Sequence, residues 1–357
     1  MCNPPPPADE NESLIKDKLI NNDMSHLNLI DIPAFTSTSL ININGQPAKR
    51  LMVVYRTVGC EYDKKRKGCS MCDFYHYADP NITEKNIQKQ HQKTLDKLRI
   101  GTFQHFDLLT LGNFFNDREI SPSLRKHLLT SLAEIKQLRR VLVESRIGYT
   151  NPDKLKQCKE FLRDDQILEY AFGYESSNEA IRNTILNKAV PERHLDDAMK
   201  LCKNAGVDFV AYVLIKPHTL PEAEGIKDAV ETAVHVLRKA EKYEINARIA
   251  FEPVFVTKGK ILETLFIQGK YTPPKLWSII EVLIRVSNIV GGNKINGKLF
   301  VGLSDENLSS NRMTSNCGQC DNEIKSAIQD FNGHQDASRL ESLYHECKDG
   351  WKAIAGV

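Results

Sequence analysis

Six short apolar segments recur along the chain, mostly at intervals of about 30 to 45 residues, and a segment with helical character follows each of the first five. They read AKRLMVVYRTV, FDLLTLGNFF, RRVLVESR, LEYAFGYES, VDFVAYVLIKP and ARIAFEPVF. A strand followed by a helix, repeated in this way, is typical of a parallel sheet covered by helices. We therefore expect an α/β fold whose strands form an open sheet or a partial (β/α)6 barrel.

The repeats do not cover the whole chain, and we divide it accordingly. Residues 1–45 form an N-terminal extension that begins MCNPPPPADENE, a proline-rich and acidic composition typical of partly disordered segments. Residues 46–260 carry the strand and helix repeats and form the barrel. Residues 261–357 form a C-terminal extension with cysteines of its own.

Composition points to an ordinary soluble enzyme or binding protein. Of 357 residues, 41% are hydrophobic and 26% charged, and the formal net charge of +2 gives no general reason to bind nucleic acid. No apolar stretch is long enough to span a membrane, and the N-terminus does not read as a signal peptide. We expect a cytoplasmic protein, and in that reducing environment clustered cysteines more often bind metal or catalyse than form disulfides.

Three of the nine cysteines stand in the loop after the first strand. Cys60, Cys69 and Cys72 have the spacing C-x8-C-x2-C, which supplies one ligand too few for structural zinc unless His76 joins them. Alternatively, a [4Fe-4S] cluster held by three cysteines keeps one iron open. Such an iron can bind the amino and carboxylate groups of S-adenosylmethionine and deliver an electron to its sulfonium, which yields a 5'-deoxyadenosyl radical.

The predicted strands lose their apolar character where they end. The segments GNFFND (112–117), ESR (144–146), YESSNE (174–179) and KPHT (216–219) follow four of them. Ligand sites of parallel α/β folds form at the carboxyl ends of the strands, so these residues are candidates for a site. Each could instead cap the helix that follows it.

A second group of soft ligands lies in the C-terminal extension. Cys317 and Cys320 form a C-x2-C pair with Gly318 at the turn, and His345 and Cys347 follow about 25 residues later. Four such ligands predict a tetrahedral zinc site. A second iron-sulfur cluster is the rival metal, and three incidental cysteines are the third interpretation.

Several segments together resemble a known family. In order, these are YRTVGCEYDKKRKGCSMCDF, LLTLGNFFNDREI, VLVESR, GYESSNEAIRNTILNK, YVLIKPHTLPEAEGIKDAV, PPKLWS and NCGQCD. They resemble the Elongator-like subgroup of the radical S-adenosylmethionine superfamily, and within it the radical lyases of archaeosine biosynthesis (RaSEA) and their bacterial relatives. The resemblance covers residues 45–351 and implies a partial TIM-like barrel. The usual first spacing in the superfamily is C-x3-C, so this loop is five residues longer.

The resemblance implies roles for the residues of the cysteine loop and its neighbours. Cys60, Cys69 and Cys72 would hold the [4Fe-4S] cluster, and Met71 would line the adenine of S-adenosylmethionine. Lys188 would supply a cation near the carboxylate of that cofactor. A solvated lysine at a helix end is the alternative for Lys188.

The strand ends receive roles from the same resemblance. Gly112 and Asn113 match the segment whose backbone meets the methionyl amino group. Glu144, Arg146 and Glu175 match polar residues that face the ribose or the amino-acid end of the cofactor.

For the substrate, the resemblance implies a tRNA that carries a lysine adduct of a deazaguanine base and is cleaved at a carbon–nitrogen bond. The basic run at 64–67, KKRK, could contact phosphates beside the active site, or it could be solvated surface. Phe74, Tyr75 and Tyr77 could stack on a base or on adenine.

Three functions follow from the sequence. The first is a radical enzyme that acts on a modified nucleoside or tRNA base, with a C–N lyase reaction. The second is a radical enzyme of the same fold that acts on a small metabolite or peptide. The third is a zinc-stabilised binding protein without redox chemistry. For the first two we expect a reductant protein such as a flavodoxin or ferredoxin, a partner enzyme that supplies the substrate, and no membrane.

Overall fold

The computed structural model describes residues 29–218, 220–291, 298–303 and 310–357. The predicted disorder at the proline-rich start of the chain lies outside these residues, as does Thr219 of the KPHT segment. One sheet contains eight strands in sequential order. They are β1 (Phe35–Ile43), β2 (Gln46–Tyr55), β3 (Phe103–Thr110), β4 (Arg140–Glu144), β5 (Ile167–Glu175), β6 (Asp208–Ile215), β7 (Ala247–Pro253) and β8 (Leu299–Val301).

Strands β2 to β8 are parallel and form most of a barrel. The six predicted strands correspond to β2 through β7, which confirms the expected partial α/β barrel. The sheet is larger than expected by one strand at each edge. Strand β1 lies in the segment assigned to the N-terminal extension, and β8 lies in the segment assigned to the C-terminal one.

A two-residue hairpin joins β1 to β2, the antiparallel pair of the sheet. Its residues Asn44 and Gly45 have φ of 53° and 84°. Left-handed backbone at both positions is the geometry of a tight hairpin turn, for which Asn-Gly is the preferred sequence. The hairpin therefore places β1 beside β2 at the open edge of the barrel.

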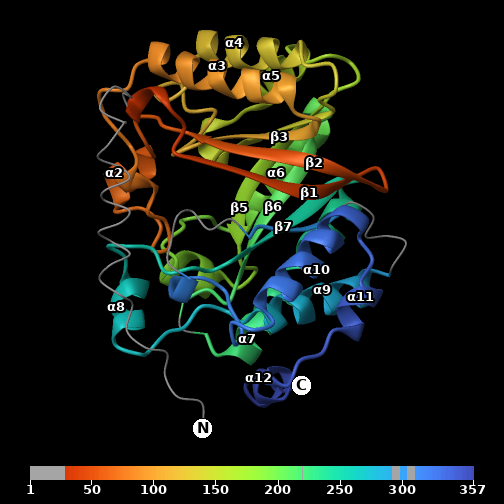
Figure 1. Ribbon diagram of the computed structural model, residues 1–357. Helices are drawn as coiled ribbons and strands as arrows, with labels where there is room; N and C mark the ends of the chain where they lie inside the picture. Colours follow the sequence, from red (N-terminus) through yellow and green to blue (C-terminus); the bar gives the residue numbers. More distant parts are fainter. Residues whose placement is uncertain (1–28, 219, 292–297, 304–309) are drawn as a thin grey trace, which may run out of the picture.

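Helices cover the outside of the sheet and occupy the loops at its carboxyl end (Figure 1). In Figure 1, α3, α4 and α5 lie together on one side of the barrel, and α2 and α8 lie at the end where β2 terminates. The helices are α2 (Glu61–Arg66), α3 (Glu84–Ile100), α4 (Pro122–Ala133), α5 (Pro152–Glu160), α6 (Arg193–Ala205), α7 (Glu222–Lys242), α8 (Ile261–Ile267), α9 (Leu276–Val290), α10 (Asp321–His334), α11 (Ser338–Ser342) and α12 (Cys347–Ala355).

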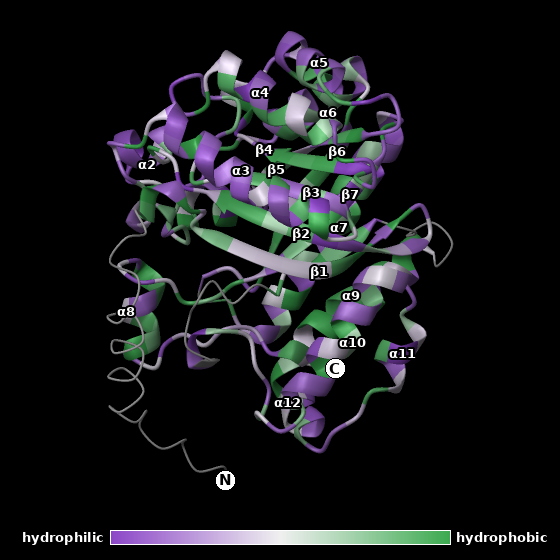
Figure 2. Ribbon diagram, turned by 45° about the horizontal axis from the view of Figure 1, so that its top comes forward, coloured by the Kyte–Doolittle hydropathy of each residue, from purple (hydrophilic) through white to green (hydrophobic). Residues whose placement is uncertain are grey.

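The short helical turns are η1 (Leu29–Asp31), η2 (Phe74–His76), η3 (Ile147–Tyr149), η6 (Ser310–Arg312) and a π-helix, η4 (Ala180–Ile185). Figure 2 shows the strands as mostly hydrophobic, whereas α3, α4 and α5 turn hydrophilic residues outward. None of the described helices has the length and apolarity needed to cross a membrane.

Helix α10 fills the gap between the two edges of the sheet. The side chain of Asn332 exchanges hydrogen bonds with the backbone of Val301 at 2.9 and 3.0 Å, and Gln335 does the same for Leu299 at 3.1 and 2.8 Å. At the other edge, Asn42 donates to the carbonyl of α10 residue Gly333 at 2.8 Å. The short edge strand β8 thus has its backbone groups satisfied by side chains, and the barrel is nearly closed.

Inside the barrel the side chains form layers. At the amino ends of the strands lies a buried ionic network that we call the ionic floor; it consists of Arg50, His105, Asp107, Arg140, Glu169, Asp208 and Arg248. Above it lies an apolar layer that includes Met52, Leu109, Leu142, Ala171, Val210 and Ala250. Polar side chains follow at the carboxyl ends, so the barrel has one polar mouth.

Candidate functional site

The three cysteines of the first loop lie at the carboxyl end of the barrel. Cys60 is the N-cap residue of α2, and Cys69 and Cys72 lie in the turn after that helix. All three are unpaired and partly buried. The turn is held in place by Ser70, whose backbone N–H and hydroxyl donate to the carbonyls of Leu186 and Ile185, each at 3.0 Å.

The chemistry of these thiols suits a metal cluster. Burial raises the pKa of Cys72, and the neighbouring Cys69 and Cys60 raise it further because the three thiolates repel one another. Burial likewise raises the pKa of Cys60. If all three thiols ionised, their charges would repel one another, and a bound cation would offset that repulsion. The Nε2 of His76 lies 3.3 Å from the carbonyl oxygen of Lys258, so this nitrogen contacts a backbone group and not a thiol.

Gly112 and Asn113 form a turn directly against Cys60. A Cβ on Gly112 would lie 2.8 Å from the Cα of Cys60, so only glycine permits this approach. Asn113 is fully buried; its Nδ2 lies 3.7 Å from the Sγ of Cys60, and its Oδ1 accepts from the backbone N–H of Arg146 at 2.8 Å. The turn therefore links the cysteine loop to the end of β4.

Glu175 and Lys188 form a buried ion pair at the mouth, with 2.5 Å between Oε1 and Nζ. Glu175 has φ of 70°, a strained value for this residue, and it ends β5 at a register shift. Burial works against the charge of Lys188, but the carboxylate of Glu175 raises its pKa overall. Because Lys188 is 9% exposed, the interpretation of a solvated helix-end lysine is wrong.

Arg146 and Glu144 complete the predicted strand-end residues. The guanidinium of Arg146 donates to the carbonyl of Lys188 at 2.5 Å and lies 4.0 Å from the ring centroid of Tyr62. Glu144 faces the mouth without an ion pair among the described residues. Burial raises its pKa to about 7, while Lys188 opposes this shift and Glu175 reinforces it.

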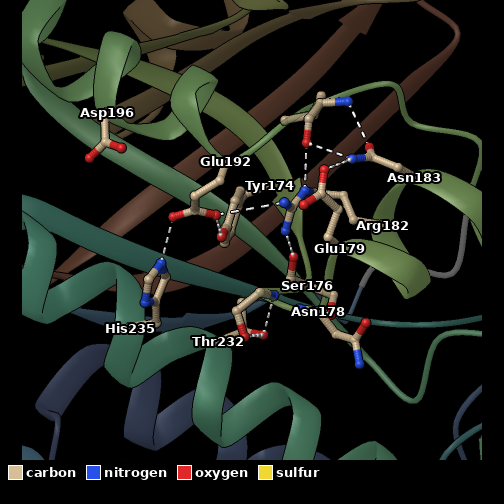
Figure 3. A network of polar contacts seen from close by, with 12 residues as sticks. Tyr174, Ser176, Asn178, Glu179, Arg182, Asn183, Glu192, Asp196, Thr232 and His235 are labelled. Carbon is tan, nitrogen blue, oxygen red and sulfur yellow. Dashed lines mark hydrogen bonds and ion pairs between the residues drawn. The ribbon is translucent and has the colours of Figure 1, made fainter.

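The segment that carries Lys188 is fixed by Arg182 of the π-helix (Figure 3). Its side chain is fully buried, donates to the carbonyls of Ser176 and Val190, and lies 3.6 Å from the carboxylate of Glu192. Its guanidinium carbon also lies 4.5 Å from the ring centroid of Tyr174. We call this arrangement the Arg182 clasp.

The clasp supports the cysteine loop as well. Leu186 and Asn187 directly follow the π-helix, and both make hydrogen bonds to the cysteine loop. Leu186 accepts from Ser70, and the Nδ2 of Asn187 donates to the carbonyl of Gly68 at 2.7 Å. The ends of β2 and β5 are joined in this way.

The aromatic residues after the cysteines divide into two groups. Phe74 and Tyr77 pack against Phe35 of β1, with ring centroids 6.1 and 4.6 Å apart. Tyr75 is exposed, and the ammonium of Lys260 lies 4.5 Å from its ring centroid. Met71 packs instead against the apolar cluster at the ends of β6 and β7. The basic run 64–67 is exposed on α2 and just after it.

Four residues of the mouth were not among the sequence predictions. Glu119 and Thr57 are buried beside Cys60, and Tyr212 and Glu252 face the interior from β6 and β7. Burial raises the pKa of Glu252 to about 8, which Arg50 opposes. Glu252 could have been found from strand periodicity, because it alternates with buried apolar residues in ARIAFEPVF. No local signal marks Glu119.

The C-terminal ligands come together as predicted. The ligand atoms of Cys317, Cys320, His345 and Cys347 all lie within 4.8 Å of one another. The Sγ atom of Cys320 lies 3.7 Å from the Sγ atoms of both Cys317 and Cys347. The Nδ1 of His345 lies 3.8 Å from the Sγ of Cys317.

These separations distinguish the candidate metals. Two thiolates at 2.3 Å from one tetrahedral ion lie about 3.8 Å apart. In a four-iron cluster each cysteine binds a different iron, and the sulfur atoms lie roughly 6 Å apart or more. The C-terminal site therefore fits a single tetrahedral ion and not a second cluster, and its cysteines are not incidental.

Hydrogen bonds from neighbouring residues orient the thiols of this site. The indole Nε1 of Trp277 donates to the Cys347 sulfur at 3.3 Å, and the amide of Asn316 donates to Cys320 at 3.5 Å. Asp321 accepts from the backbone of Gly318 at 3.2 Å and so shapes the turn. Donors of this kind fix the ligand geometry of metal sites.

Comparison with known proteins gives close sequence relatives over nearly the whole chain. Archaeosine synthase subunit beta of Thermococcus kodakarensis is 31% identical over 323 residues, which cover 89% of this chain and 95% of that protein. The protein of the same name from Methanosarcina acetivorans is 29% identical over 328 residues, 91% and 90% of the two chains. An uncharacterized protein of Methanocaldococcus jannaschii is 33% identical over 317 residues, 87% and 82%.

No protein-family model matches the chain. Among solved structures, methylornithine synthase aligns over 85% of each chain with a TM-score of 0.47 and 14% identity. Elp3 of Methanocaldococcus infernus aligns over 70% of this chain and 59% of its own with a TM-score of 0.45 and 14% identity. On the strength of its sequence relatives, the chain belongs to the archaeosine synthase subunit beta family.

Proposed function

We propose that the protein uses a [4Fe-4S] cluster, held by Cys60, Cys69 and Cys72, to cleave S-adenosylmethionine reductively. The observation that carries this proposal is a set of three partly buried thiols at the mouth of the barrel, in a loop whose His76 contacts the carbonyl of Lys258 through Nε2. When bound, the cluster supplies one electron to S-adenosylmethionine, and a 5'-deoxyadenosyl radical results. Membership of an enzyme family leaves the alternative of a zinc-stabilised binding protein without support.

The residues around the thiols have complementary tasks in this proposal. The backbone of the turn at Gly112 and Asn113 receives the methionyl amino group, and the cation of Lys188 faces the carboxylate. Glu144, Arg146 and Glu175 orient the ribose and amino-acid ends, and Met71 contacts adenine. All of these assignments rest on the resemblance. Met71 packs against an apolar cluster at the same mouth.

For the substrate we propose a modified nucleoside or tRNA base, with cleavage of a carbon–nitrogen bond. The names of the relatives support this class, as does the exposed basic run 64–67 at the mouth. A small metabolite or peptide is the second candidate. Because the relatives are named as subunits, we also propose a partner enzyme that supplies the substrate, and a flavodoxin or ferredoxin as reductant.

The C-terminal site is proposed to hold structural Zn²⁺. Three cysteines and one histidine at tetrahedral separations leave no open position for a substrate. The ion would tie the start of α12 to the turn before α10, and so attach the end of the chain to the barrel.

Anaerobic reconstitution with iron and sulfide tests the radical proposal. The wild type is compared with a triple Cys60→Ala, Cys69→Ala, Cys72→Ala variant and with Cys158→Ala, a buried thiol outside both groups. We expect a broad absorbance near 400 nm and 5'-deoxyadenosine formation with dithionite in the wild type and in Cys158→Ala alone. Zinc without iron in the wild type, and no cleavage of S-adenosylmethionine, would refute the proposal.

A gel-shift titration with tRNA at increasing salt concentration tests the substrate class. If phosphates contact the basic run, the logarithm of the affinity falls linearly with the logarithm of the salt concentration. Replacement of Lys64 and Lys67 by Glu reduces the slope, whereas Lys200→Glu on the outer face of α6 does not. Binding that is absent at low salt would favour the small-molecule alternative.

A further inference from the structure

Glu119 is a buried carboxylate next to the cysteine loop, and it has no assigned role. It is 5% exposed and lies in the turns between β3 and α4. No lysine, arginine or histidine of the described residues forms an ion pair with it; Lys64 acts on it only at longer range. A buried carboxylate without a cation is costly, so its retention calls for a specific explanation.

Both oxygens of Glu119 accept short hydrogen bonds. Oε1 accepts from the hydroxyl of Thr57 at 2.6 Å, and Oε2 accepts from the backbone N–H of Asn113 at 2.6 Å. The hydroxyl of Thr57 in turn accepts from the backbone N–H of Gly59, the residue before Cys60, at 3.2 Å. One carboxylate thus joins the backbone that leads into the first cysteine to the turn that follows β3.

The carboxylate of Glu119 also lies close to Gly112. A Cβ on Gly112 would lie 2.3 Å from Oε2 of Glu119 and 2.8 Å from the Cα of Cys60. Glycine at this position therefore admits the carboxylate and the cysteine backbone to the same small space. The carboxylate of Glu119 and the backbone of the first cysteine thus both lie against Gly112.

We propose that Glu119 is a positioning residue that holds the Gly112–Asn113 turn against Cys60 and places a fixed negative charge beside the cluster. The inference rests on the proposed [4Fe-4S] cluster. Through its hydrogen bonds, Glu119 fixes the backbone proposed to receive the methionyl amino group. Through its charge it opposes the one-electron reduction of the cluster from the 2+ to the 1+ state, because reduction adds negative charge nearby.

Two substitutions separate geometry from charge. In Glu119→Gln, the amide oxygen can still accept from Asn113 and the amide N–H can donate to the Thr57 hydroxyl, so the contacts persist without the charge. In Glu119→Ala both contacts are lost. Glu134→Gln is the matched control, since Glu134 is an exposed carboxylate just after α4.

The first measurement is hydrogen–deuterium exchange of the full-length chain, which does not depend on the cluster. We expect Glu119→Ala to accelerate exchange of the Asn113 amide by roughly tenfold or more, and Glu119→Gln and Glu134→Gln to leave it near the wild-type rate. An unchanged rate in Glu119→Ala would refute the positioning role.

The second measurement is the midpoint potential of the reconstituted cluster, followed by electron paramagnetic resonance during titration with dithionite. We expect a more positive potential in Glu119→Gln than in the wild type and in Glu134→Gln. Equal potentials in all three would refute the role of the charge. If the wild type forms no cluster, the proposed function fails, and the exchange rates still decide whether Glu119 positions the turn.

Discussion

The chain holds two cysteine groups, and their surroundings differ in what they supply. At the C-terminus, four ligand atoms lie within 4.8 Å of one another, and Trp277 and Asn316 orient two of the sulfur atoms. At the barrel mouth, the side chain of Asn113 contacts the Cys60 sulfur, and backbone groups of the cysteine loop contact the thiols of Cys60 and Cys72. A closed site of the first kind contributes to folding, whereas an open one leaves a position for chemistry.

The largest expected effects come from removing one cysteine of each group. Cys69→Ala should abolish formation of 5'-deoxyadenosine and leave the melting temperature nearly unchanged. Cys320→Ala should remove the C-terminal ion and lower the free energy of unfolding by about 3 kcal/mol or more, because metal binding adds directly to stability. Activity assays and thermal unfolding check both. Cys158→Ala controls for the loss of a buried thiol, and equal stability losses in Cys158→Ala and Cys320→Ala would contradict a structural ion.

Breaking the Arg182 clasp should affect only the open site. Arg182→Met removes the donors to Ser176 and Val190 and so loosens the segment against which the cysteine loop is hydrogen-bonded. We expect iron bound per chain to fall by about half or more after reconstitution, with zinc unchanged. Elemental analysis measures both metals. Lys200→Met, an exposed change on α6, should leave both at wild-type levels; parallel loss of zinc and iron in Arg182→Met would indicate general unfolding instead.

Ionisation of Glu252, at the barrel mouth, should lower the free energy of unfolding at high pH. Burial raises the pKa of Glu252 to about 8 from an ordinary value of 4.5. The folded state therefore holds this proton more tightly than the unfolded state, and the stability it provides is complete below about pH 4.5 and lost as the pH rises through about 8. Glu252→Gln cannot ionise and should be more stable than the wild type above pH 8 by about 1 to 3 kcal/mol.

Urea unfolding at pH 5 and pH 8.5 measures this difference. The exposed Glu241→Gln serves as the control and should follow the wild type at both pH values. A gain for Glu252→Gln of equal size at pH 5 and pH 8.5 would show that the charge of Glu252 is not the cause.

The smallest effect concerns the orientation of a single sulfur in the closed site. Trp277→Phe removes the N–H donor to Cys347 but keeps an aromatic ring, and we expect the affinity for Zn²⁺ to fall roughly tenfold. Competition with a chelator measures this affinity. Trp351→Phe is a matched control, because the indole of Trp351 donates to the hydroxyl of Ser278 at 2.8 Å and not to a thiol. Equal losses in the two variants would attribute the effect to packing.

The fold could be predicted where the strands are long and apolar. Strands β2 to β7 are buried on both faces and read as continuous apolar runs, so their order and direction followed from the pattern. Strand β1 reads FTSTSLINI, in which serine and threonine hide its strand character, although the Asn44–Gly45 pair marks the hairpin. Strand β8 has only three residues, too few for any periodicity.

The site was predictable where its residues follow a spacing. The cysteines and His345 could be recognised because metal ligands come in short, regular intervals, and Glu144 and Glu175 because they end strands. Glu119 and Arg182 have no such signal. Both side chains are held by hydrogen-bonding groups that only tertiary folding brings near. Their burial could therefore not be predicted from the residues next to them in the sequence.

The ionic floor has a consequence for the electric field within the barrel. Apart from His105, its formal charges cancel, since three guanidinium groups face three carboxylates: Arg50, Arg140 and Arg248 with Asp107, Glu169 and Asp208. An ionic network with no net charge produces only a weak electric field in the apolar layer above it. The floor therefore adds little net potential at the mouth, and its clearest effect there comes from a single member, Arg50, which opposes the rise in the pKa of Glu252.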